Sequence, residues 1–330
     1  MVGRHVHLPC KSDGVLKHRI GQSTMDPTPL RVSTMTATGQ LGVTPNLQRL
    51  YTHCYFIPYA WIGEGIIKIE YGAEKKGHST DDILHTTNKK KKHFFNQSSV
   101  VFRLRLPEGT FKETNIKLFK NGSFQITGIS SEEMGRAAVT RLIELNTADP
   151  LRAIWPAQPK IQSFTIFMMN SDYKIGKAIR RDKLYKVLVE EYGLQSSFEP
   201  TIYQGVNTKF FWNKCRPESA PPGICICPTP CTGNGTGYIV GSCIQLTIAP
   251  FRTGSVIINS AQSLEQLTDA YKFINSVFKK HEAEVLRDEP QLEQPVRKKA
   301  APVLNGPEAI IRQKMRASPK NIVRLAAVTA

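Results

Sequence analysis

Apolar and polar residues alternate in several short segments of the chain, and this period of two predicts β-strands bounded by Gly, Pro and Asn. In the segment 99–106, for example, Val100, Phe102 and Leu104 alternate with Val101, Arg103 and Arg105, which predicts a strand with one basic face. An Asn-Gly pair at Asn121-Gly122 predicts a tight hairpin turn. The predicted strands cover 30–39, 65–72, 99–106, 115–119, 123–128, 161–170, 201–203, 206–212, 244–250 and 255–259.

Other segments have apolar residues at helical spacing behind a residue that can cap a helix. A helix is predicted over 131–145, with Ser130 or Ser131 as its cap and Glu132 and Glu133 in its first turn. Further helices are predicted over 182–192 and 263–280. A shorter one is predicted behind Thr44-Pro45, where threonine would cap and proline would occupy the first turn.

The segment that follows residue 115 recurs later in the chain at an offset of 132 positions. Phe119 coincides with Phe251 and Gly122 with Gly254, and further coincidences follow without a gap. Such self-similarity at one fixed offset indicates a duplicated structural unit. The remaining coincidences are Ser123 with Ser255, Ile126 with Ile258, Ser131 with Ser263, Glu133 with Glu265, and Ala138 with Ala270.

Each unit is predicted to run strand, helix, four strands, helix, which makes the fold class α+β. The predicted organisation places an arm and a tail around the two repeats, with one insertion in each repeat. The predicted segments are the N-terminal arm 1–28, the first repeat 29–146 with a basic insertion at 73–95, the linker 147–158, the second repeat 159–283 with a Cys-rich insertion at 214–242, and the basic tail 284–330.

The charge balance indicates a polyanionic partner. The chain has 44 Lys and Arg against 27 Asp and Glu, a formal charge of +17, and the simplest partner for such an excess is nucleic acid. The tail adds a further basic segment, for which a nuclear-import signal is an alternative interpretation. The chain contains no apolar run of the roughly 18 residues that span a bilayer and no secretory signal near Met1, so we expect no membrane association and an intracellular protein.

Most of the cysteines gather in the second insertion. Cys225, Cys227, Cys231 and Cys243 have a spacing that predicts a tetrahedral zinc site. Disulfides and free thiols are the alternatives, and an odd count of seven cysteines does not indicate a secreted disulfide framework. No catalytic constellation is present, so no enzyme activity is expected and no cofactor is required apart from this zinc.

Several short motifs, in this order and in both halves, resemble the TATA-box-binding protein family. They are Val32-Ser33-Thr34, Phe119-x-x-Gly122, Ile126-Thr127-Gly128-x-x-Ser131-Glu132-Glu133, Lys160-Ile161-Gln162, Phe198-Glu199-Pro200-x-x-Tyr203-x-Gly205 and Phe251-x-x-Gly254. Three further stretches are most similar to the divergent forms of this family in large (nucleocytoplasmic) DNA viruses: Phe94-Phe95-Asn96-Gln97, Lys117-Leu118-Phe119-Lys120-Asn121-Gly122 and Val206-Asn207-Thr208-Lys209-Phe210-Phe211. The resemblance covers most of 29–283. It implies a pseudo-two-fold saddle with about ten strands in one curved antiparallel sheet and helices on the convex face.

The resemblance also implies that the concave face lies in the minor groove of A·T-rich DNA and that aromatic wedges kink the duplex. Phe119 and Phe251 match the wedge at the end of the fourth strand of each half. Tyr203 matches the other wedge of the second half. In the first half, the residue nearest to the equivalent wedge position is Phe95 or its neighbour Phe94. The predicted concave-face residues are Val32, Thr34, Thr127, Ser163, Thr165 and Asn259.

Basic residues at the rim of the saddle are the candidates for phosphate contacts. They are Lys89, Lys90, Lys91, Lys92, Arg103, Arg105, Lys117, Lys120, Lys209 and Arg252. The sequence departs from the family where Leu30 and Ser163 replace asparagines that read base edges, and where Asn259 replaces the second central threonine. We therefore expect binding driven by DNA shape rather than strict sequence reading.

The sequence thus predicts a protein that binds and bends promoter DNA in support of viral transcription initiation, with a B-type transcription factor and RNA polymerase subunits as further partners. The alternative is a virion component, associated with capsid or genome and with other virion proteins, that keeps the fold without promoter specificity. A third hypothesis is a recognition module for a separate nucleic-acid enzyme. The expected location is the host cytoplasm (viral factory) or nucleus, with packaging in the virion as an alternative.

Overall fold

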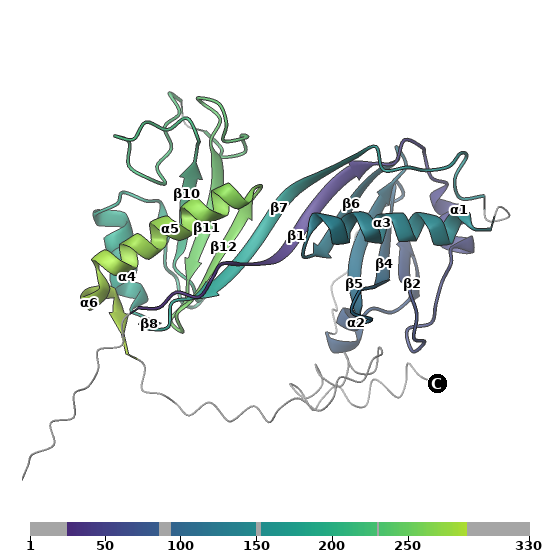
Figure 1. The fold of residues 1–330 in the computed structure, drawn as a ribbon, viewed down its shortest axis with the longest axis horizontal. Coiled ribbons are helices and arrows are strands. Elements are labelled where there is room, and N and C mark those ends of the chain that lie inside the picture. The colour runs from purple at the N-terminus through teal and green to yellow at the C-terminus, as the bar shows by residue number, and fades with distance from the viewer. Residues whose placement is uncertain (1–24, 86–93, 150–152, 230, 289–330) are drawn as a thin grey trace, which may run out of the picture.

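A computed structural model describes residues 25–85, 94–149, 153–229 and 231–288. Two halves lie end to end, and two long strands run between them (Figure 1). Among the described helices, none has both the length and the apolar content needed to span a bilayer. Residues 1–24 of the predicted arm, the lysine run 89–92 and residues 289–330 of the predicted tail lie outside the described residues.

The first half alternates strands and helices as the hydrophobic pattern predicts, with one additional strand and helix after β2. Its elements are β1 (Arg31–Gln40), α1 (Leu47–His53), β2 (Gly65–Tyr71), β3 (Glu74–Gly77), α2 (Thr80–Leu84), β4 (Gln97–Arg105), β5 (Phe111–Phe119), β6 (Ser123–Ile129) and α3 (Glu132–Thr147).

The second half repeats the order strand, helix, four strands, helix, with a further short strand β8 before α4 and two short elements after α5. Its elements are β7 (Ser163–Lys174), β8 (Ala178–Ile179), α4 (Arg181–Glu190), β9 (Ser196–Ser197), β10 (Asn207–Trp212), β11 (Ile244–Pro250), β12 (Ser255–Ala261), α5 (Leu264–Lys280), α6 (Glu282–Val285) and β13 (Leu286–Arg287).

All strands except β8 and β13 form one sheet, in the order β3-β2-β4-β5-β6-β1-β7-β12-β11-β10-β9. The order is symmetric about the antiparallel pair β1 and β7, which joins the halves with Arg31 opposite Asp172 and Gln40 opposite Ser163. The predicted α+β class and the duplication are confirmed. The sheet has eleven strands rather than about ten, because β3 in the first insertion pairs with β2.

The long helices α3 and α5 pack on the same side of the sheet (Figure 1). Ile116, Leu118 and Ile126 are fully buried beneath α3 in the first core. Ile248, Val256 and Ile258 are fully buried in the second core, which also includes the buried face of α5. Burying each such aliphatic side chain stabilises the fold by about 1.5–3 kcal/mol, so period-two patterning fixes which side of each strand the helices cover.

The two hairpin turns share one geometry, which explains the coincidence of Gly122 with Gly254. Both glycines have positive φ, 80° and 78°, and each donates its N–H to the preceding phenylalanine carbonyl, Phe119 or Phe251, at 3.0 Å. A Cβ on Gly122 would collide with the Val43 carbonyl, and one on Gly254 with the Lys177 carbonyl. Only glycine fits both the conformation and the close approach.

Helix caps follow the same duplication. Ser131 accepts the N–H of Met134 at 3.1 Å, and Ser263 accepts the N–H of Gln266 at 3.3 Å. The predicted cap of the first short helix is wrong, since α1 begins at Leu47 and its cap is Asn46, which accepts the N–H of Arg49. Asn46 also donates its backbone N–H to Ile154, a buried residue of the predicted linker.

The predicted strand around 201–203 is also wrong. Ile202 and Tyr203 both donate their backbone N–H groups to the Glu199 carbonyl at 2.9 Å, which closes a turn. The strand that pairs with β10 is β9, with Asn207 opposite Ser197. Pro200 at the head of this turn cannot donate a ladder hydrogen bond, so the pairing ends before it.

Candidate nucleic-acid interface

The side of the sheet opposite α3 and α5 is called the open face below, and its side chains are the alternate positions that the core does not use. On β1 these are Thr34, Thr36 and Thr38, and on β7 they include Ser163 and Thr165. Cross-strand partners point to the same side, so Thr127 lies beside Thr36, and Asn259 beside Thr247. The centre of the open face is therefore lined by short polar side chains.

The structure places five of the six predicted concave-face residues on the open face: Thr34, Thr127, Ser163, Thr165 and Asn259. Val32 is the exception. It lies opposite buried Ser171 and packs against the second core, because the register shifts between Val32 and Thr34. This bulge moves Val32 to the helix side, and period-two reasoning cannot foresee it.

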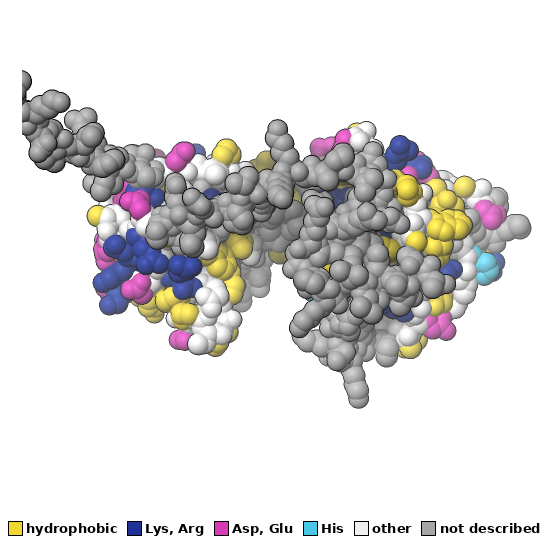
Figure 2. Space-filling model, turned by 90° about the horizontal axis from the view of Figure 1, so that it is seen from below, with side chains coloured by type: hydrophobic (Ala, Val, Ile, Leu, Met, Phe, Trp, Pro, Cys, Tyr) yellow, Lys and Arg dark blue, Asp and Glu magenta, His cyan; other side chains and the backbone are white. Residues whose placement is uncertain are grey.

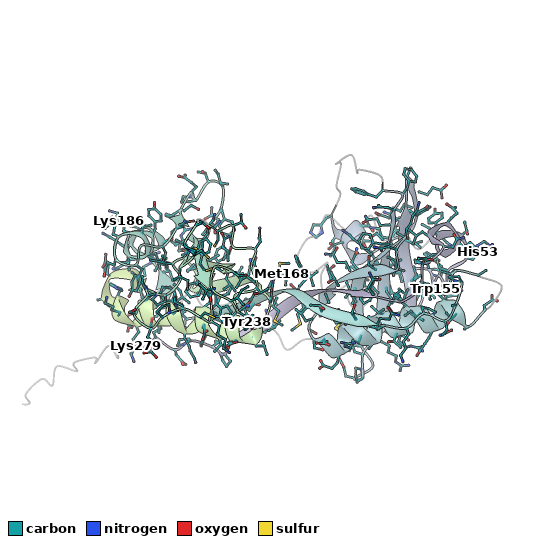
Figure 3. The ribbon with its side chains drawn as sticks, turned by 90° about the horizontal axis from the view of Figure 1, so that it is seen from above. His53, Trp155, Met168, Lys186, Tyr238 and Lys279 are labelled. Atoms are coloured by element: carbon teal, nitrogen blue, oxygen red, sulfur yellow. The ribbon has the colours of Figure 1, made fainter. Side chains whose placement is uncertain are left out.

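A second register shift lies in β7. Thr36 pairs with Met168 and Ala37 pairs with Ile166, so Phe167 between them has no partner in β1. There Phe167 becomes 57% exposed, and Met168 lies in the narrow middle of the molecule (Figure 3). Asn170 donates its amide to Thr34 Oγ1 at 3.2 Å across the central pair. Sequence reasoning missed Phe167 and Asn170. A phenylalanine in line with Ser163 and Thr165 was the available signal.

The second half carries a pair of aromatic rings at the end of its sheet. The rings of Tyr203 and Phe251 meet edge to face with centroids 5.6 Å apart, and Tyr203 is 39% exposed. Partial burial raises the pKa of Tyr203. A Cβ on Gly205 would lie 2.9 Å from Tyr203 Cε1 and 3.2 Å from Phe251 Cζ, so glycine is needed between the rings. The structure thus brings together the two wedge candidates of this half.

The first half presents Phe119 at the corresponding end of β5, opposite Gln97 of β4. Phe95 lies two residues before Gln97, is 62% exposed and meets Tyr71 edge to face with centroids 6.4 Å apart. The N–H of Lys120 donates to the Asn96 carbonyl at 3.0 Å and ties this segment to the turn after Phe119. The Phe95 ring therefore has a ring partner on β2, whereas Phe94 is tied to the end of that strand through its carbonyl, which accepts the N–H of Gly72 at 3.3 Å.

A groove on the open face runs from this aromatic end towards the centre of the sheet. Its lining includes Phe119 and Gln125 from the first half, Thr38 from β1, and Thr165 and Phe167 from β7. The groove therefore joins a wedge candidate to the polar centre and includes residues from both halves.

Most of the predicted phosphate-binding residues that the structure describes lie at the rim of the open face. Lys117 lies opposite Ser99 and Gln125 on this face, and Lys209 lies opposite Thr247. Lys120 and Arg252 follow Phe119 and Phe251 directly, and both are exposed, as is Arg105. Lys and Arg side chains also gather at the far end of the second half (Figure 2).

Arg103 does not face solvent, which corrects its prediction as a phosphate contact. It is 1% exposed and donates to the carbonyls of Trp61 at 2.8 Å and Tyr59 at 3.0 Å. Its guanidinium lies 5.0 Å from the centre of the Tyr59 ring. Burial lowers the pKa of Arg103, and the charge of Glu113 opposes that shift. Arg103 thus holds the loop that contains Tyr59 and Trp61 against the sheet.

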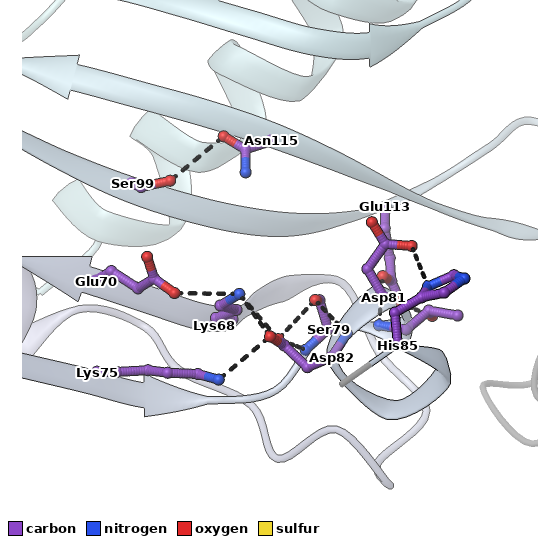
Figure 4. A network of polar contacts seen from close by, with 11 residues as sticks. Lys68, Glu70, Lys75, Ser79, Asp81, Asp82, His85, Ser99, Glu113 and Asn115 are labelled. Atoms are coloured by element: carbon purple, nitrogen blue, oxygen red, sulfur yellow. Dashed lines mark hydrogen bonds and ion pairs between the residues drawn. The ribbon is translucent and has the colours of Figure 1, made fainter. Parts of the chain in front are cut away.

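The first insertion docks α2 onto the open face of the first half through polar contacts (Figure 4). Glu113 on β5 accepts the N–H of Thr80 at 3.0 Å and its hydroxyl at 2.6 Å. Asp82 pairs with Lys68 on β2 at 2.9 Å and accepts the N–H of Ser79, which caps α2. This insertion was predicted as a basic loop. Its described part adds acidic side chains beside a groove that reaches Thr127.

These contacts set the charge states of the pair. Burial alone would raise the pKa of Asp82, but hydrogen bonds from Lys68 and Ser79 outweigh it and hold that pKa well below its usual value. For Lys68, burial lowers the pKa, and the contacts with Asp82 and Glu70 outweigh it and raise the pKa. Both groups are therefore charged at neutral pH, and the ion pair holds α2 in place.

The Cys-rich insertion converges at the other end of the molecule. The sulfurs of Cys225, Cys227, Cys231 and Cys243 all lie within 4.8 Å of one another. Cys215 does not join them, and its thiol donates to the Tyr238 carbonyl at 3.3 Å. The structure therefore brings together the four predicted metal ligands and separates them from the nearest further cysteine.

No family model matches the chain. Known proteins similar to the chain were found by sequence and by structure. A protein of Acanthamoeba polyphaga mimivirus described as TATA-box-binding protein-like is 28% identical over 233 residues, 66% of this chain and 57% of that protein. The chain thus spans little more than half of the viral protein. Methanococcus jannaschii TBP superposes with a TM-score of 0.44 at 15% identity, covering 77% of this chain and 99% of its own. The resemblance to the TATA-box-binding protein family that the sequence predicts is confirmed by the viral relative.

Proposed function

We propose that the open face binds double-stranded DNA in the minor groove and bends it, and that this activity supports transcription initiation. The observation that carries the proposal is the pairing of Tyr203 with Phe251 at one end of the sheet, with Phe119 at the corresponding end of the other half. Two aromatic ends related by a pseudo-two-fold axis suit a duplex, which has the same approximate symmetry. The name of the mimivirus protein supports the same ligand.

The mechanism follows from the chemistry of the two ends. An aromatic ring inserted between base pairs unstacks them, which costs a few kcal/mol for each step, and the bent duplex then contacts more of the protein. Tyr203 and Phe251 stabilise each other edge to face, so their wedge is already assembled before DNA binds. Little side-chain freedom is then lost on binding.

The centre of the open face suits the minor groove of A·T-rich DNA. Threonine and asparagine side chains, such as Thr34, Thr127 and Asn259, are short enough for a flat approach and can donate hydrogen bonds to the acceptors on base edges there. Thr34 already accepts a hydrogen bond from Asn170. Since the minor groove distinguishes A·T from G·C mainly, preference should follow composition and shape.

Basic side chains at the rim supply the remaining affinity. Lys120 and Arg252 follow the wedge residues directly, and Lys117 and Lys209 lie on the open face, where phosphates of a bent duplex would pass. Each phosphate contact releases counterions, so affinity should fall steeply with salt. The opposite side, with α3 and α5, stays open to a B-type factor and to RNA polymerase subunits.

The test combines binding and bending. Phe119→Ala with Phe251→Ala should weaken binding to an A·T-rich duplex by about 100-fold or more, since each stacked ring is worth about 1–3 kcal/mol, and should remove bending. Ile202→Ala is the matched control, because Ile202 is an apolar residue of the Tyr203 turn and is 84% exposed. Gel shifts and fluorescence energy transfer between the duplex ends measure the two effects.

Unchanged bending in the double variant would reject the wedge assignment. Binding with a steep salt dependence and no preference for A·T over G·C would instead favour the virion component, which needs DNA affinity without promoter choice. Circular dichroism checks that the double variant keeps its fold.

A further inference from the structure

Four cysteine sulfurs converge at the end of the second half, far from the residues proposed to contact DNA in the first. The Sγ atoms of Cys225 and Cys231 lie 3.2 Å apart and those of Cys227 and Cys243 lie 3.5 Å apart. All four lie within 4.8 Å of one another. Cys243 is 1% exposed, and the other three are half-buried.

We propose that Cys225, Cys227, Cys231 and Cys243 bind one Zn²⁺ ion in a tetrahedral all-thiolate site. A Zn–S bond of about 2.3 Å in tetrahedral geometry separates the sulfurs by roughly 3.8 Å, and the four sulfurs of this cluster are already near that spacing. On binding, each thiol gives its proton to solvent and its sulfur coordinates the metal. Four soft ligands around a closed position match structural zinc and leave no open position for catalysis.

The surrounding backbone holds the ligands in this arrangement. Cys243 directly precedes β11, and its carbonyl accepts the N–H of Gly235 at 2.9 Å. The N–H of Cys227 points to Cys225 Sγ at 3.5 Å, a contact that stabilises a thiolate. The Asn213 amide approaches Cys243 Sγ at 3.8 Å. Peptide and amide donors around the sulfurs are the outer contacts that a thiolate site needs.

A metal cross-link would stabilise the insertion, because its described residues between Lys214 and Ser242 form no helix or strand. It nevertheless extends the sheet. Phe211 donates its N–H to the Gly223 carbonyl at 2.9 Å, and Gln245 donates its N–H to the Gly233 carbonyl at 2.8 Å. Zinc would tie the segment between these two attachments to Cys243, the residue directly before β11.

Cys215 provides an internal comparison. It belongs to the same insertion, yet it is exposed and its thiol contacts the Tyr238 carbonyl rather than another sulfur. A site selected by geometry should require the four clustered cysteines and ignore this fifth one.

The experiment measures metal on the full-length protein purified without chelators or added metal. Elemental analysis should find about one zinc per chain. Cys225→Ser and Cys231→Ser should each lower the zinc content at least tenfold, and Cys215→Ser should leave it unchanged. Cobalt exchanged into the wild-type protein should give the absorption of a tetrahedral thiolate complex.

A second measurement needs no substitution and so does not depend on how a variant folds. Removing zinc from the wild-type protein with a chelator should speed hydrogen exchange at least tenfold in 214–242 and leave the first half unchanged. Absence of bound metal together with no cobalt complex would overturn the proposal. Disulfides between these cysteines in the native protein, or iron in place of zinc, would also overturn it. Because the readouts are metal content and exchange, the result is independent of DNA binding.

Discussion

The two halves share one frame but carry different additions at the outer ends of the sheet. In the first half, α2 and the loop around Tyr59 lie over β2 and β4, where Ile57, Tyr59, Ile67, Ile83 and Val101 form a small separate core. In the second half, the Cys-rich insertion continues beside β10 and β11. The duplicated turns and caps are nearly identical, whereas the additions use unrelated chemistry.

The difference shows what a duplicated sheet leaves undetermined. Buried apolar positions and turn glycines are fixed by packing against α3 and α5, so they recur in both halves. The outer ends of the sheet are not constrained by this packing. Each half therefore has different side chains at its outer end, supplied by its own insertion and loops. The first half uses Arg103 and carboxylates, and the second half offers four thiols.

The comparison also has a consequence for charge. Glu70, Asp82 and Glu113 lie at the outer part of the open face in the first half, where Lys68 and Lys75 pair with the first two of these carboxylates but not with Glu113. On the open face of the second half, Lys209 lies opposite Thr247. A polyanion on this face would meet different potentials at the two ends. Under the proposed function, this asymmetry would favour one of the two orientations of a duplex.

The largest expected effect tests whether the first half depends on its buried cation. Arg103→Met should lower the free energy of unfolding by about 2–4 kcal/mol, because the Tyr59 and Trp61 carbonyls lose a charged donor. Arg105→Met, two residues along the same strand and exposed, should change it by less than about 0.5 kcal/mol. Urea unfolding measures both. Equal effects for the two variants would show that burial of Arg103 contributes nothing.

A smaller effect tests the acidic cover of the first half. Glu113→Gln leaves Thr80 with one acceptor oxygen instead of two, so α2 should open about tenfold more often in hydrogen exchange, which equals about 1.4 kcal/mol. Losing a negative charge on the open face should also raise DNA affinity several-fold. Glu108→Gln is the matched control, because Glu108 is exposed and accepts a hydrogen bond from the nearby Thr110 hydroxyl. Weaker DNA binding by Glu113→Gln would argue against a DNA-facing position for α2.

The smallest effect concerns pH. Because the folded-state pKa of Asp82 lies below its unfolded value, its contribution is complete above about pH 4 and is lost as the pH falls below that. The pKa of Lys68 is raised, so its contribution is lost only as the pH rises above about 10. Protection of α2 should therefore be flat between these limits and fall by about 1 kcal/mol in acid, an amount reduced by solvent screening. In Asp82→Asn this acid step should disappear, and its persistence would assign the step to another group.

Local patterns in the sequence predicted most strands, both hairpin turns and the cap of α3, because each depends on residues close together in the chain. The failures occurred where distant segments compete. Val32 alternates as an open-face residue should, but a bulge between β1 and β7 turns it towards the helices. Arg103 has the spacing of an exposed position, yet a loop from more than forty residues earlier covers it. Period-two patterning identifies the side of a strand but not what packs on that side.

The sequence by itself determined the duplication, the α+β class and the identity of the aromatic and cysteine candidates, since these follow from repeated local signals and residue chemistry. Only the tertiary structure decided that Tyr203 meets Phe251, that α2 docks through Glu113 and Lys68, and that four sulfurs converge while Cys215 remains apart. Those contacts join segments whose relative positions depend on the register of the whole sheet. Register is set by the packing of the complete core, and no single segment contains that information.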